Sequence, residues 1–360
     1  MTANHTVTEQ MMTLNASATY SAAFTNSSSA TDPKSSASLG ITILSVAFII
    51  GFPGNAFVIW TILTRMSKRT VTCILILHLA MADIIVILTA PFFLHLLSTR
   101  SWTFGEVMCK LCHYVSGLSM YSSIYLITFM SMDRFLAVSK PYVSQKIRTK
   151  LTARIIVLVI WIQASVLAIP VPLYRTVKIK GDVQHCITIG SPVNGGFQHI
   201  VFQNMLETIM GFVLPFSIIV FCYGYIGLKL RTVKFQIKNK TSRLVIMIIV
   251  TFALFWIPYH VVNIIQVSGE LSSSLKLKEA AYFAKPNATA FAFLSSSINP
   301  LLYVFAGGNF IRTAGVGFMA KLFEGTGSEA STLRKVSQVF QQRSRKQSSE
   351  QGKLTKPTEE

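Results

Sequence analysis

Seven long apolar stretches, separated by short polar segments, dominate the hydrophobic pattern of the chain. A helix needs roughly 20 mostly apolar residues to cross about 30 Å of hydrocarbon, and each stretch reaches that length. Because the polar connections are short, the pattern predicts an all-α membrane protein whose seven helices pack as one bundle. The predicted spans are Ile41–Leu63, Val71–Leu97, Cys109–Val138, Leu151–Leu173, Ile200–Leu230, Arg243–Val267 and Ala281–Phe305.

Three segments flank the predicted bundle, which occupies residues 38–306. Residues 1–37 are rich in Ser, Thr, Asn and Ala, which predicts a disordered segment. They lack a basic region followed by an apolar core, so we expect no cleavable signal peptide. Residues 307–323 have the apolar face of an amphipathic helix that lies along the membrane. Residues 324–360 are polar and rich in Ser and Thr, and form a predicted cytoplasmic tail.

Composition supports a membrane location. The 360 residues are 51% hydrophobic and 13% charged, against about 25% charged in a typical soluble domain. The net charge of +19 would suggest nucleic-acid binding in a soluble protein. Here it is explained by cationic loops that face anionic inner-leaflet lipids, so no nucleic-acid partner is expected.

The distribution of Lys and Arg predicts the orientation. Cationic residues gather in the loops after the first and third spans and between the fifth and sixth spans, which places those loops in the cytoplasm. The N-terminus is then extracellular, as expected for a multi-pass protein of the plasma membrane. Three glycosylation sequons on that side agree with this orientation. They begin at Asn4, Asn15 and Asn26.

Two cysteines are predicted to form a disulfide on the external side. Cys109 opens the third span, and Cys186 lies in the second external loop, so both face an oxidising compartment. Cys112 lies one helical turn below Cys109 and is the competing partner for Cys186. Cys73 and Cys222 fall inside apolar spans, where cysteine behaves as a small packing residue.

Motifs for enzyme catalysis are missing from the sequence. It contains no HExxH, phosphate-binding loop or nucleophile elbow, so neither an enzyme activity nor an organic cofactor is expected. A membrane transporter is the alternative from a different class. Transporters commonly show two related halves with broken helices at matched positions, and we find no internal repeat.

Polar residues and prolines recur in every span. Asp83 lies in the middle of the second span, where a charged group is costly and indicates function. The set comprises Asn55, Asp83, Asp133-Arg134-Phe135, Trp161, Pro215 with Tyr223, Phe255-Trp256-Ile257-Pro258 and Asn299-Pro300-Leu301-Leu302-Tyr303. In this order it resembles the rhodopsin-like family of G-protein-coupled receptors over roughly Ser38–Phe323. Two motifs depart from the usual pattern, because Phe135 replaces a tyrosine and Phe255 replaces a cysteine.

The resemblance implies an activation switch and an allosteric ion. Prolines at positions 215, 258 and 300 make helix hinges plausible, and movement of the sixth helix would free Arg134 and Tyr223 to meet a G protein. The residues implied in the switch are Asp133, Arg134, Pro215, Ile124, Phe252, Tyr223 and Tyr303. The residues implied around a sodium ion are Asp83, Asn55, Ser123, Ser296 and Asn299. A neutral, hydrogen-bonded Asp83 is the alternative to an ion.

The resemblance also bears on the ligand. Ser116 stands where aminergic receptors have an aspartate, and Phe293 stands where opsins have a lysine, so neither an amine nor retinal is expected. Several stretches look like the leukotriene B4 receptors, which implies a lipid mediator, inhibitory G proteins, receptor kinases and arrestin as partners. These stretches are Leu88–His95, Cys112–Val115, Val143–Lys146, Tyr174–Val177, Pro258–Asn263, Phe293–Ser297, Ala314–Phe318 and Glu324–Glu329.

Inward-facing residues near the external side form the candidate ligand site. A mostly apolar site with a few placed polar groups suits a hydroxylated fatty acid. Another oxidised lipid or a chemoattractant peptide is the alternative ligand. Each inward residue also has a purely structural interpretation: a packing role for His113 and the tyrosines, a snorkelling Arg175, and a protonated Glu207. The candidates are His113, Ser116, Tyr121, Arg175, Glu207, Trp256, Tyr259 and Asn263.

Overall fold

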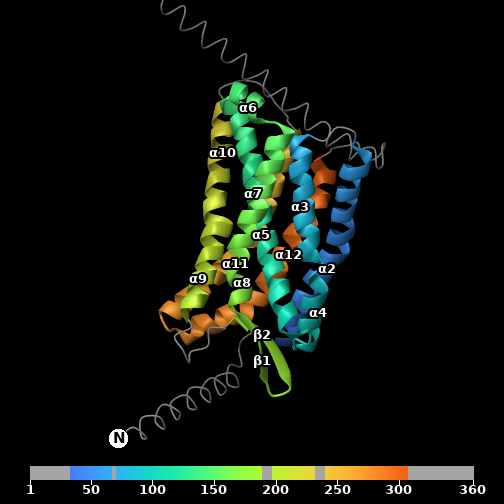
Figure 1. Cartoon of the computed structure of the whole chain (residues 1–360). Coiled ribbons are helices and arrows are strands. Elements are labelled where there is room, and N and C mark those ends of the chain that lie inside the picture. The colour runs from blue at the N-terminus through green and yellow to red at the C-terminus, as the bar shows by residue number, and fades with distance from the viewer. Residues whose placement is uncertain (1–32, 67–69, 189–196, 232–239, 307–360) are drawn as a thin grey trace, which may run out of the picture.

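The computed structural model describes residues 33–66, 70–188, 197–231 and 240–306. These residues form seven helical rods that run side by side, with a short β-hairpin at one end (Figure 1). The predicted glycosylation sites, the amphipathic helix at 307–323 and the tail at 324–360 lie outside the described residues.

Each predicted span corresponds to one rod, and several rods consist of more than one helical element. The first helix begins at Pro33, so its first residues fall within the segment 1–37 that was expected to precede the bundle. The first rod consists of α2 (Pro33–Trp60) and the π-helix η1 (Thr61–Arg65), and the second of α3 (Val71–Ile87) and α4 (Ala90–Thr99). The third rod is α5 (Gly105–Ser139), and the fourth consists of α7 (Lys150–Ala168) and α8 (Pro170–Leu173). The fifth consists of α9 (Phe197–Thr208), the π-helix η3 (Ile209–Val213) and α10 (Leu214–Arg231), the sixth is α11 (Lys240–Leu271), and the seventh is α12 (Leu275–Ala306).

Proline explains most of the interruptions. A proline lacks the N–H of the helical hydrogen bond, and its ring clashes with the preceding turn. Accordingly α4 begins just before Pro91, α8 begins at Pro170, and η3 ends just before Pro215. Pro258 and Pro300 lie within the continuous helices α11 and α12, where the sequence predicted hinges.

Six of the seven rods are long and apolar enough to cross a membrane. The seventh rod, α12, is equally long but more polar, because it carries Lys276, Lys278, Glu279 and Lys285 in its first half. The outward faces of the rods remain apolar; Leu158 and Ile162 on α7, for example, are 60% and 56% exposed. Lipid is the solvent that such a surface requires.

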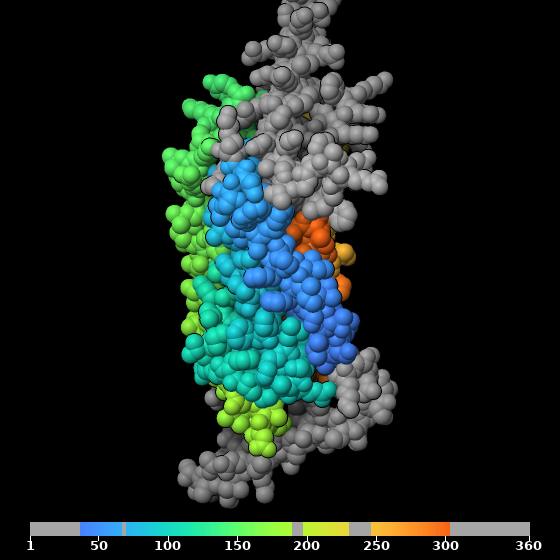
Figure 2. All heavy atoms as spheres, turned by 90° about the vertical axis from the view of Figure 1, so that its right-hand side faces the viewer, coloured from blue at the N-terminus to red at the C-terminus, as the bar shows by residue number. Residues whose placement is uncertain are grey.

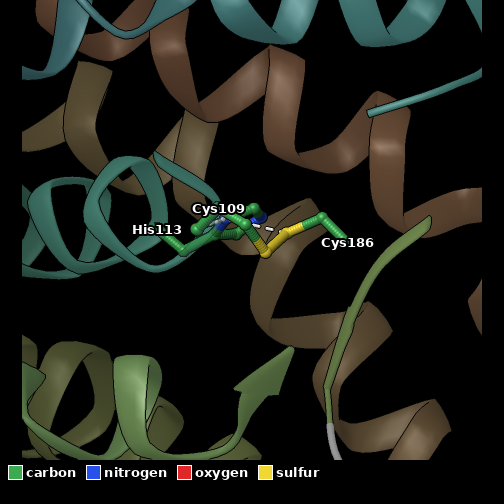
Figure 3. A group of neighbouring side chains, drawn as sticks. All are labelled: Cys109, His113 and Cys186. Atoms are coloured by element: carbon green, nitrogen blue, oxygen red, sulfur yellow. Dashed lines mark hydrogen bonds between the residues drawn. A yellow bond between two sulfur atoms is a disulfide. The ribbon is translucent and has the colours of Figure 1, made fainter. Parts of the chain in front are cut away.

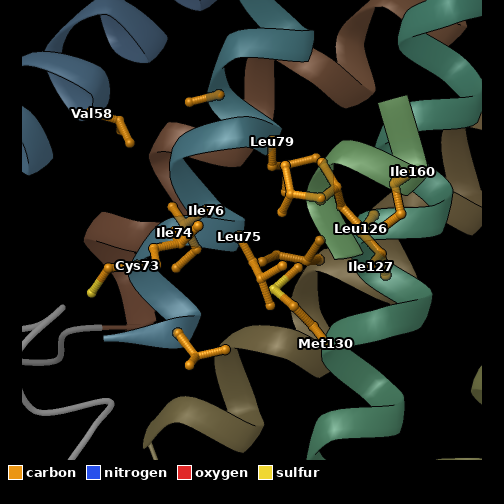
Figure 4. Close-up of a cluster of buried hydrophobic side chains, with 14 of the residues drawn as sticks. Val58, Cys73, Ile74, Leu75, Ile76, Leu79, Leu126, Ile127, Met130 and Ile160 are labelled. Carbon is orange, nitrogen blue, oxygen red and sulfur yellow. The ribbon is translucent and has the colours of Figure 1, made fainter. Parts of the chain in front are cut away.

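The interior is packed mainly with aliphatic side chains. Figure 4 shows Leu75 and Leu79 of α3 directed toward Leu126 and Met130 of α5, in a buried cluster that also reaches α7 and α11. In Figure 2, α2 runs along one face of the bundle and α12 emerges beside it. The first and last rods are therefore neighbours, which closes the bundle.

The two ends of the bundle carry different elements. Strands β1 (Arg175–Lys180) and β2 (Val183–Thr188) form an antiparallel hairpin at the end that the charge pattern assigns to the exterior. The short helix α6 (Pro141–Ile147) lies at the opposite end, between α5 and α7 (Figure 1).

Candidate functional site

The hairpin is tied to the bundle beside the candidate ligand site. The structure pairs Cys109 of α5 with Cys186 of β2, as expected, and leaves Cys112 as a buried free thiol. Cys186 lies opposite Val177 of β1, and Arg175 lies two residues before Val177 on β1. The disulfide therefore anchors β2 to α5, and β1, which carries Arg175, is held there through its pairing with β2.

His113 lies next to this disulfide. Its Nδ1 is 2.8 Å from the carbonyl oxygen of Cys109 and 3.7 Å from Sγ of Cys186 (Figure 3). The spacing of Cys109, His113 and Cys186 resembles that of a metal site. Both sulfurs are consumed by the disulfide, however, and a metal requires the thiolate. The bond to the carbonyl assigns the proton to Nδ1, which leaves Nε2 as the acceptor of the ring.

Glu207 of α9 is the centre of a polar cluster between three rods. Its Oε2 accepts a hydrogen bond from the hydroxyl of Tyr259 at 2.7 Å and one from Nδ2 of Asn263 at 3.3 Å. Its Oε1 accepts a third bond from Nε2 of Gln203 at 3.0 Å. The structure thus brings together three of the predicted ligand residues from α9 and α11, with Glu207 holding the other two.

Arg175 faces this cluster from the hairpin. The residue is partly exposed, but its Nε is buried and has no hydrogen-bond partner among the residues that the structure describes. Burial lowers the pKa of the guanidinium from its ordinary value, and the nearby Tyr259 and Glu207 oppose that shift. Arginine remains protonated in proteins, so this position holds a cation with an unused donor.

Lys285 of α12 completes the cluster and was not among the predicted site residues. Its ammonium donates to oxygens of Asn204, Asn263 and Gln266. The sequence contained a signal for it, because Lys285 is a charged residue inside the predicted span Ala281–Phe305. The reasoning that selected Asp83 applies equally to this lysine.

The remaining predicted ligand residues lie deeper or make local bonds. Trp256 packs edge-to-face on Tyr259, with ring centroids 5.7 Å apart, and donates to the hydroxyl of Ser295 at 3.0 Å. Tyr121 is fully buried, and its hydroxyl has no hydrogen-bond partner within residues 33–66, 70–188, 197–231 and 240–306. Ser116 donates to the carbonyl of Cys112 one turn earlier, so its hydroxyl proton is used within its own helix.

Asp83 lies at the midpoint of the bundle among the residues implied around a sodium ion. Its Oδ2 accepts from Nδ2 of Asn299 at 2.7 Å. Asn55 donates to the carbonyl oxygen of Ser296. Three buried oxygens of this group have no hydrogen-bond partner in the described part of the chain: Oδ1 of Asp83, Oδ1 of Asn55 and Oγ of Ser123. Carboxylate, amide and hydroxyl oxygens are suitable ligands for a hard cation.

The end of the bundle that carries α6 contains two arginines linked through Thr72. Nη2 of Arg134 donates to the hydroxyl of Thr72 on α3 at 2.8 Å. The ion-pair partner of Asp133 is Arg148, at 3.0 Å between Nε and Oδ1. Arg148 also donates to Thr72, at 3.2 Å. Asp133 and Arg134 were predicted from their motif, whereas Arg148 and Thr72 were not among the predicted residues.

The predicted packing residues of the switch lie below Trp256. Ile124 and Phe252 are buried in one cluster with Trp256, and the rings of Phe252 and Trp256 are stacked with centroids 5.6 Å apart. Pro215 is buried on α10. Tyr223 packs near the cytoplasmic end against Val138 and Ile226, whereas the side chain of Tyr303 lies outside the described part of the chain.

Comparison with known proteins defines the class. The model of the rhodopsin-family seven-transmembrane receptors matches residues 54–303. The chain therefore belongs to the rhodopsin family of seven-transmembrane receptors, as its motifs predicted.

Within that family the chain is similar to leukotriene B4 receptors and, at lower identity, to a C3a receptor. It is 49% identical to leukotriene B4 receptor 1 of Homo sapiens, over 82% of this chain and 85% of that receptor. It is 37% identical to leukotriene B4 receptor 2 of Homo sapiens, over 82% and 83% of the two chains. It is also 30% identical to a C3a anaphylatoxin chemotactic receptor of Oncorhynchus mykiss, over 82% and 81%.

Proposed function

We propose that the chain is a plasma-membrane receptor for leukotriene B4, most similar in function to the type 1 receptors. It would activate heterotrimeric G proteins, mainly of the inhibitory class, in leukocyte chemotaxis. Identities of 46–49% to type 1 receptors from four species support the ligand assignment. The family supports G-protein coupling.

The observation that carries the ligand proposal is the unused donor of Arg175. Leukotriene B4 has one carboxylate and two hydroxyls, so its site requires one available cation and several neutral polar groups. A guanidinium can bind both oxygens of a carboxylate at once. The groups proposed to bind the two ligand hydroxyls are those of His113, Glu207, Tyr259 and Asn263. Glu207 accepts hydrogen bonds from Tyr259 and Asn263, and it lies close to Arg175.

The charges of the cluster agree with a ligand that carries one negative charge. Arg175 and Lys285 are cations, and Glu207 is the anion that lies close to both. The cluster therefore carries a net charge of about +1 when Glu207 is ionised. A monocarboxylate neutralises this charge, which lowers the cost of burying the cluster once water is displaced.

Replacement of Arg175 by Ala tests this assignment. Removing one member of a desolvated, hydrogen-bonded charge pair costs about 2–5 kcal/mol, or tens to thousands of times in affinity. Arg175→Ala should therefore weaken leukotriene B4 strongly, whereas its methyl ester should bind the wild type poorly and lose little more in the variant. Lys178→Ala, an exposed cation on the same strand, is the matched control and should bind both ligands normally.

Two outcomes would contradict the proposal. If acid and ester lose affinity equally in Arg175→Ala, this arginine does not bind the carboxylate. If no hydroxylated fatty acid activates the wild-type receptor while a chemoattractant peptide does, the lipid assignment is wrong. The similarity to the C3a receptor favours the peptide as the second candidate, because a terminal carboxylate of a peptide would suit the same arginine.

The carboxylate of Asp83 is the proposed centre of a sodium site. The three unpartnered oxygens of Asp83, Asn55 and Ser123 support this proposal, because an ion would use acceptors that hydrogen bonds do not. Ser296 and Asn299 are the remaining residues of the site. The ion would hold α2, α3, α5 and α12 together and thereby favour the inactive arrangement.

Residues beyond 324 are the proposed target of receptor kinases. Phosphate on their Ser and Thr residues would add negative charge among basic residues and recruit arrestin. Agonist-dependent phosphorylation of the full-length receptor, lost on truncation at Gly325, would support this proposal. A truncated receptor that desensitises and internalises normally would contradict it.

A further inference from the structure

The ammonium of Lys285 has no remaining hydrogen-bond donor. A lysine ammonium carries three N–H groups, and this one donates to three neutral amide oxygens. They are Oδ1 of Asn204 at 2.9 Å, Oδ1 of Asn263, and Oε1 of Gln266 at 3.3 Å. The same ammonium lies 4.9 Å from the centroid of the Tyr259 ring, within the range of a cation–π contact.

The three bonds join three different helices. Asn204 belongs to α9, Asn263 and Gln266 belong to α11, and Lys285 belongs to α12. Within the described parts of the chain no carboxylate forms an ion pair with Lys285. The lysine is therefore held by neutral acceptors, in contrast to Arg175, whose Nε has none.

Lys285 determines how the amide of Asn263 is oriented. The oxygen of this amide faces Lys285, and its nitrogen faces the carboxylate of Glu207 at 3.3 Å. The two ends of an amide have nearly the same shape, and neighbouring donors and acceptors decide which end points where. A cation on one side and an anion on the other allow only one orientation.

The same contacts extend to Tyr259. The Glu207 oxygen that accepts from Asn263 also accepts from the hydroxyl of Tyr259 at 2.7 Å. Lys285 therefore contacts the ring face of Tyr259 directly, and it is also linked to the hydroxyl of Tyr259 by hydrogen bonds through Asn263 and Glu207. Asn263 and Tyr259 are two of the residues assigned above to the hydroxyls of the ligand.

We propose that Lys285 is a positioning residue for ligand recognition, and that it orients Asn263 and Tyr259 toward the ligand hydroxyls without binding the carboxylate. This inference rests on the proposed lipid ligand. The two cations then have different roles. Arg175 binds the carboxylate, and Lys285 orients the groups that bind the hydroxyls of the ligand.

The test compares leukotriene B4, its methyl ester and an analogue that lacks one hydroxyl, on the full-length receptor in lipid nanodiscs. Lys285→Met removes the three donors and keeps an unbranched side chain. It should weaken the acid and the ester by the same factor, about tenfold, which is the size expected when a buried acceptor loses its partner. It should also reduce the preference for leukotriene B4 over the analogue.

Two further variants make the test specific. Lys278→Met on the same helix removes a lysine that is paired with Glu270 at 2.6 Å and should change none of the three affinities. Asn263→Ala should remove the same part of the binding energy as Lys285→Met, so the double variant should bind little worse than either single variant. Lys285→Gln, which retains two donors, replaces Lys285→Met if the latter does not reach the membrane.

Three results would overturn the inference. A loss confined to the acid, with the ester unchanged, would show that Lys285 binds the carboxylate. Equal loss of acid, ester and analogue would show that Lys285 does not orient the hydroxyl-binding groups. Additive losses in the double variant would separate Lys285 from Asn263.

The same variants distinguish failure of this inference from failure of the proposed function. If the wild type binds no hydroxylated fatty acid, the proposed function fails first. The contact between Lys285 and Asn263 is then tested by measuring the thermal unfolding temperature of the ligand-free receptor. Lys285→Met and Asn263→Ala should lower the unfolding temperature non-additively, and additive effects would contradict the link between them.

Discussion

Nε of Arg148, just beyond the short helix α6, lies 3.0 Å from Oδ1 of Asp133 on α5. Both side chains are largely buried, each with 10% relative exposure. Arg148 also donates to Thr72, the hydroxyl that accepts from Arg134. Arg148 is therefore linked to Arg134 through one shared group, the hydroxyl of Thr72, and is bound to the neighbouring Asp133 by an ion pair.

Loss of Arg148 should raise the basal activity of the receptor. Arg148→Gln removes the ion pair that holds the loop to α5 and α3, and truncation of a largely buried pair is costly. If the change favours the active arrangement by about 1.4 kcal/mol, ligand-independent nucleotide exchange rises about tenfold. Exchange in membranes with matched receptor density measures this effect. Arg154→Gln, an exposed arginine on α7, is the control, and unchanged exchange in Arg148→Gln would reject the role.

Arg134 should be required for coupling but not for ligand binding. Its guanidinium is buried at the cytoplasmic end, next to Thr72 and far along α5 from the ligand cluster. Arg134→Ala should abolish agonist-stimulated nucleotide exchange and leave agonist affinity measured without G protein unchanged. Full signalling by a variant that reaches the cell surface would refute the assignment.

The disulfide should matter for the ligand site because it anchors the strand that carries Arg175. Cys109→Ala or Cys186→Ala should reduce surface expression or ligand binding, since loss of a native disulfide typically costs about 2–5 kcal/mol. Cys112→Ala, which removes a buried free thiol, should have a much smaller effect. Peptide mapping that finds Cys112 bonded to Cys186 would contradict the structure.

Sodium should weaken agonist binding if an ion occupies the site around Asp83. Agonists would favour the arrangement that excludes the ion, so their affinity should fall as sodium replaces a larger monovalent cation at constant ionic strength. Asp83→Asn keeps the size of the side chain and removes its charge, so the sodium effect should disappear. Agonist affinity that is indifferent to sodium in the wild type would count against the ion.

Much of the architecture could be predicted from the sequence because it depends on local properties. Seven apolar stretches of sufficient length predict seven helices, and the charge of the loops predicts their orientation. The motifs around Asp83, Arg134, Trp256 and Asn299 predict the family, which the comparison confirms. Each of these inferences uses residues close together in the chain, so no knowledge of helix packing is required.

Pairings between distant residues required the tertiary structure. The sequence predicted the pairing of Cys109 with Cys186 but kept Cys112 as a competitor, and the docking of β2 on α5 confirmed Cys109. The Asp133-Arg134-Phe135 motif identified Asp133 but not its partner Arg148, which lies 15 residues further along the chain, beyond α6.

The same limit applies to Lys285, whose three acceptors belong to α9 and α11. The hydrophobic pattern determines that a helix crosses the membrane, and the rotation of each helix determines which polar groups meet inside it. That rotation is set by packing against all the neighbouring helices at once. The sequence by itself therefore determined seven spans and a family and predicted an orientation, and the tertiary structure decided which side chains act together.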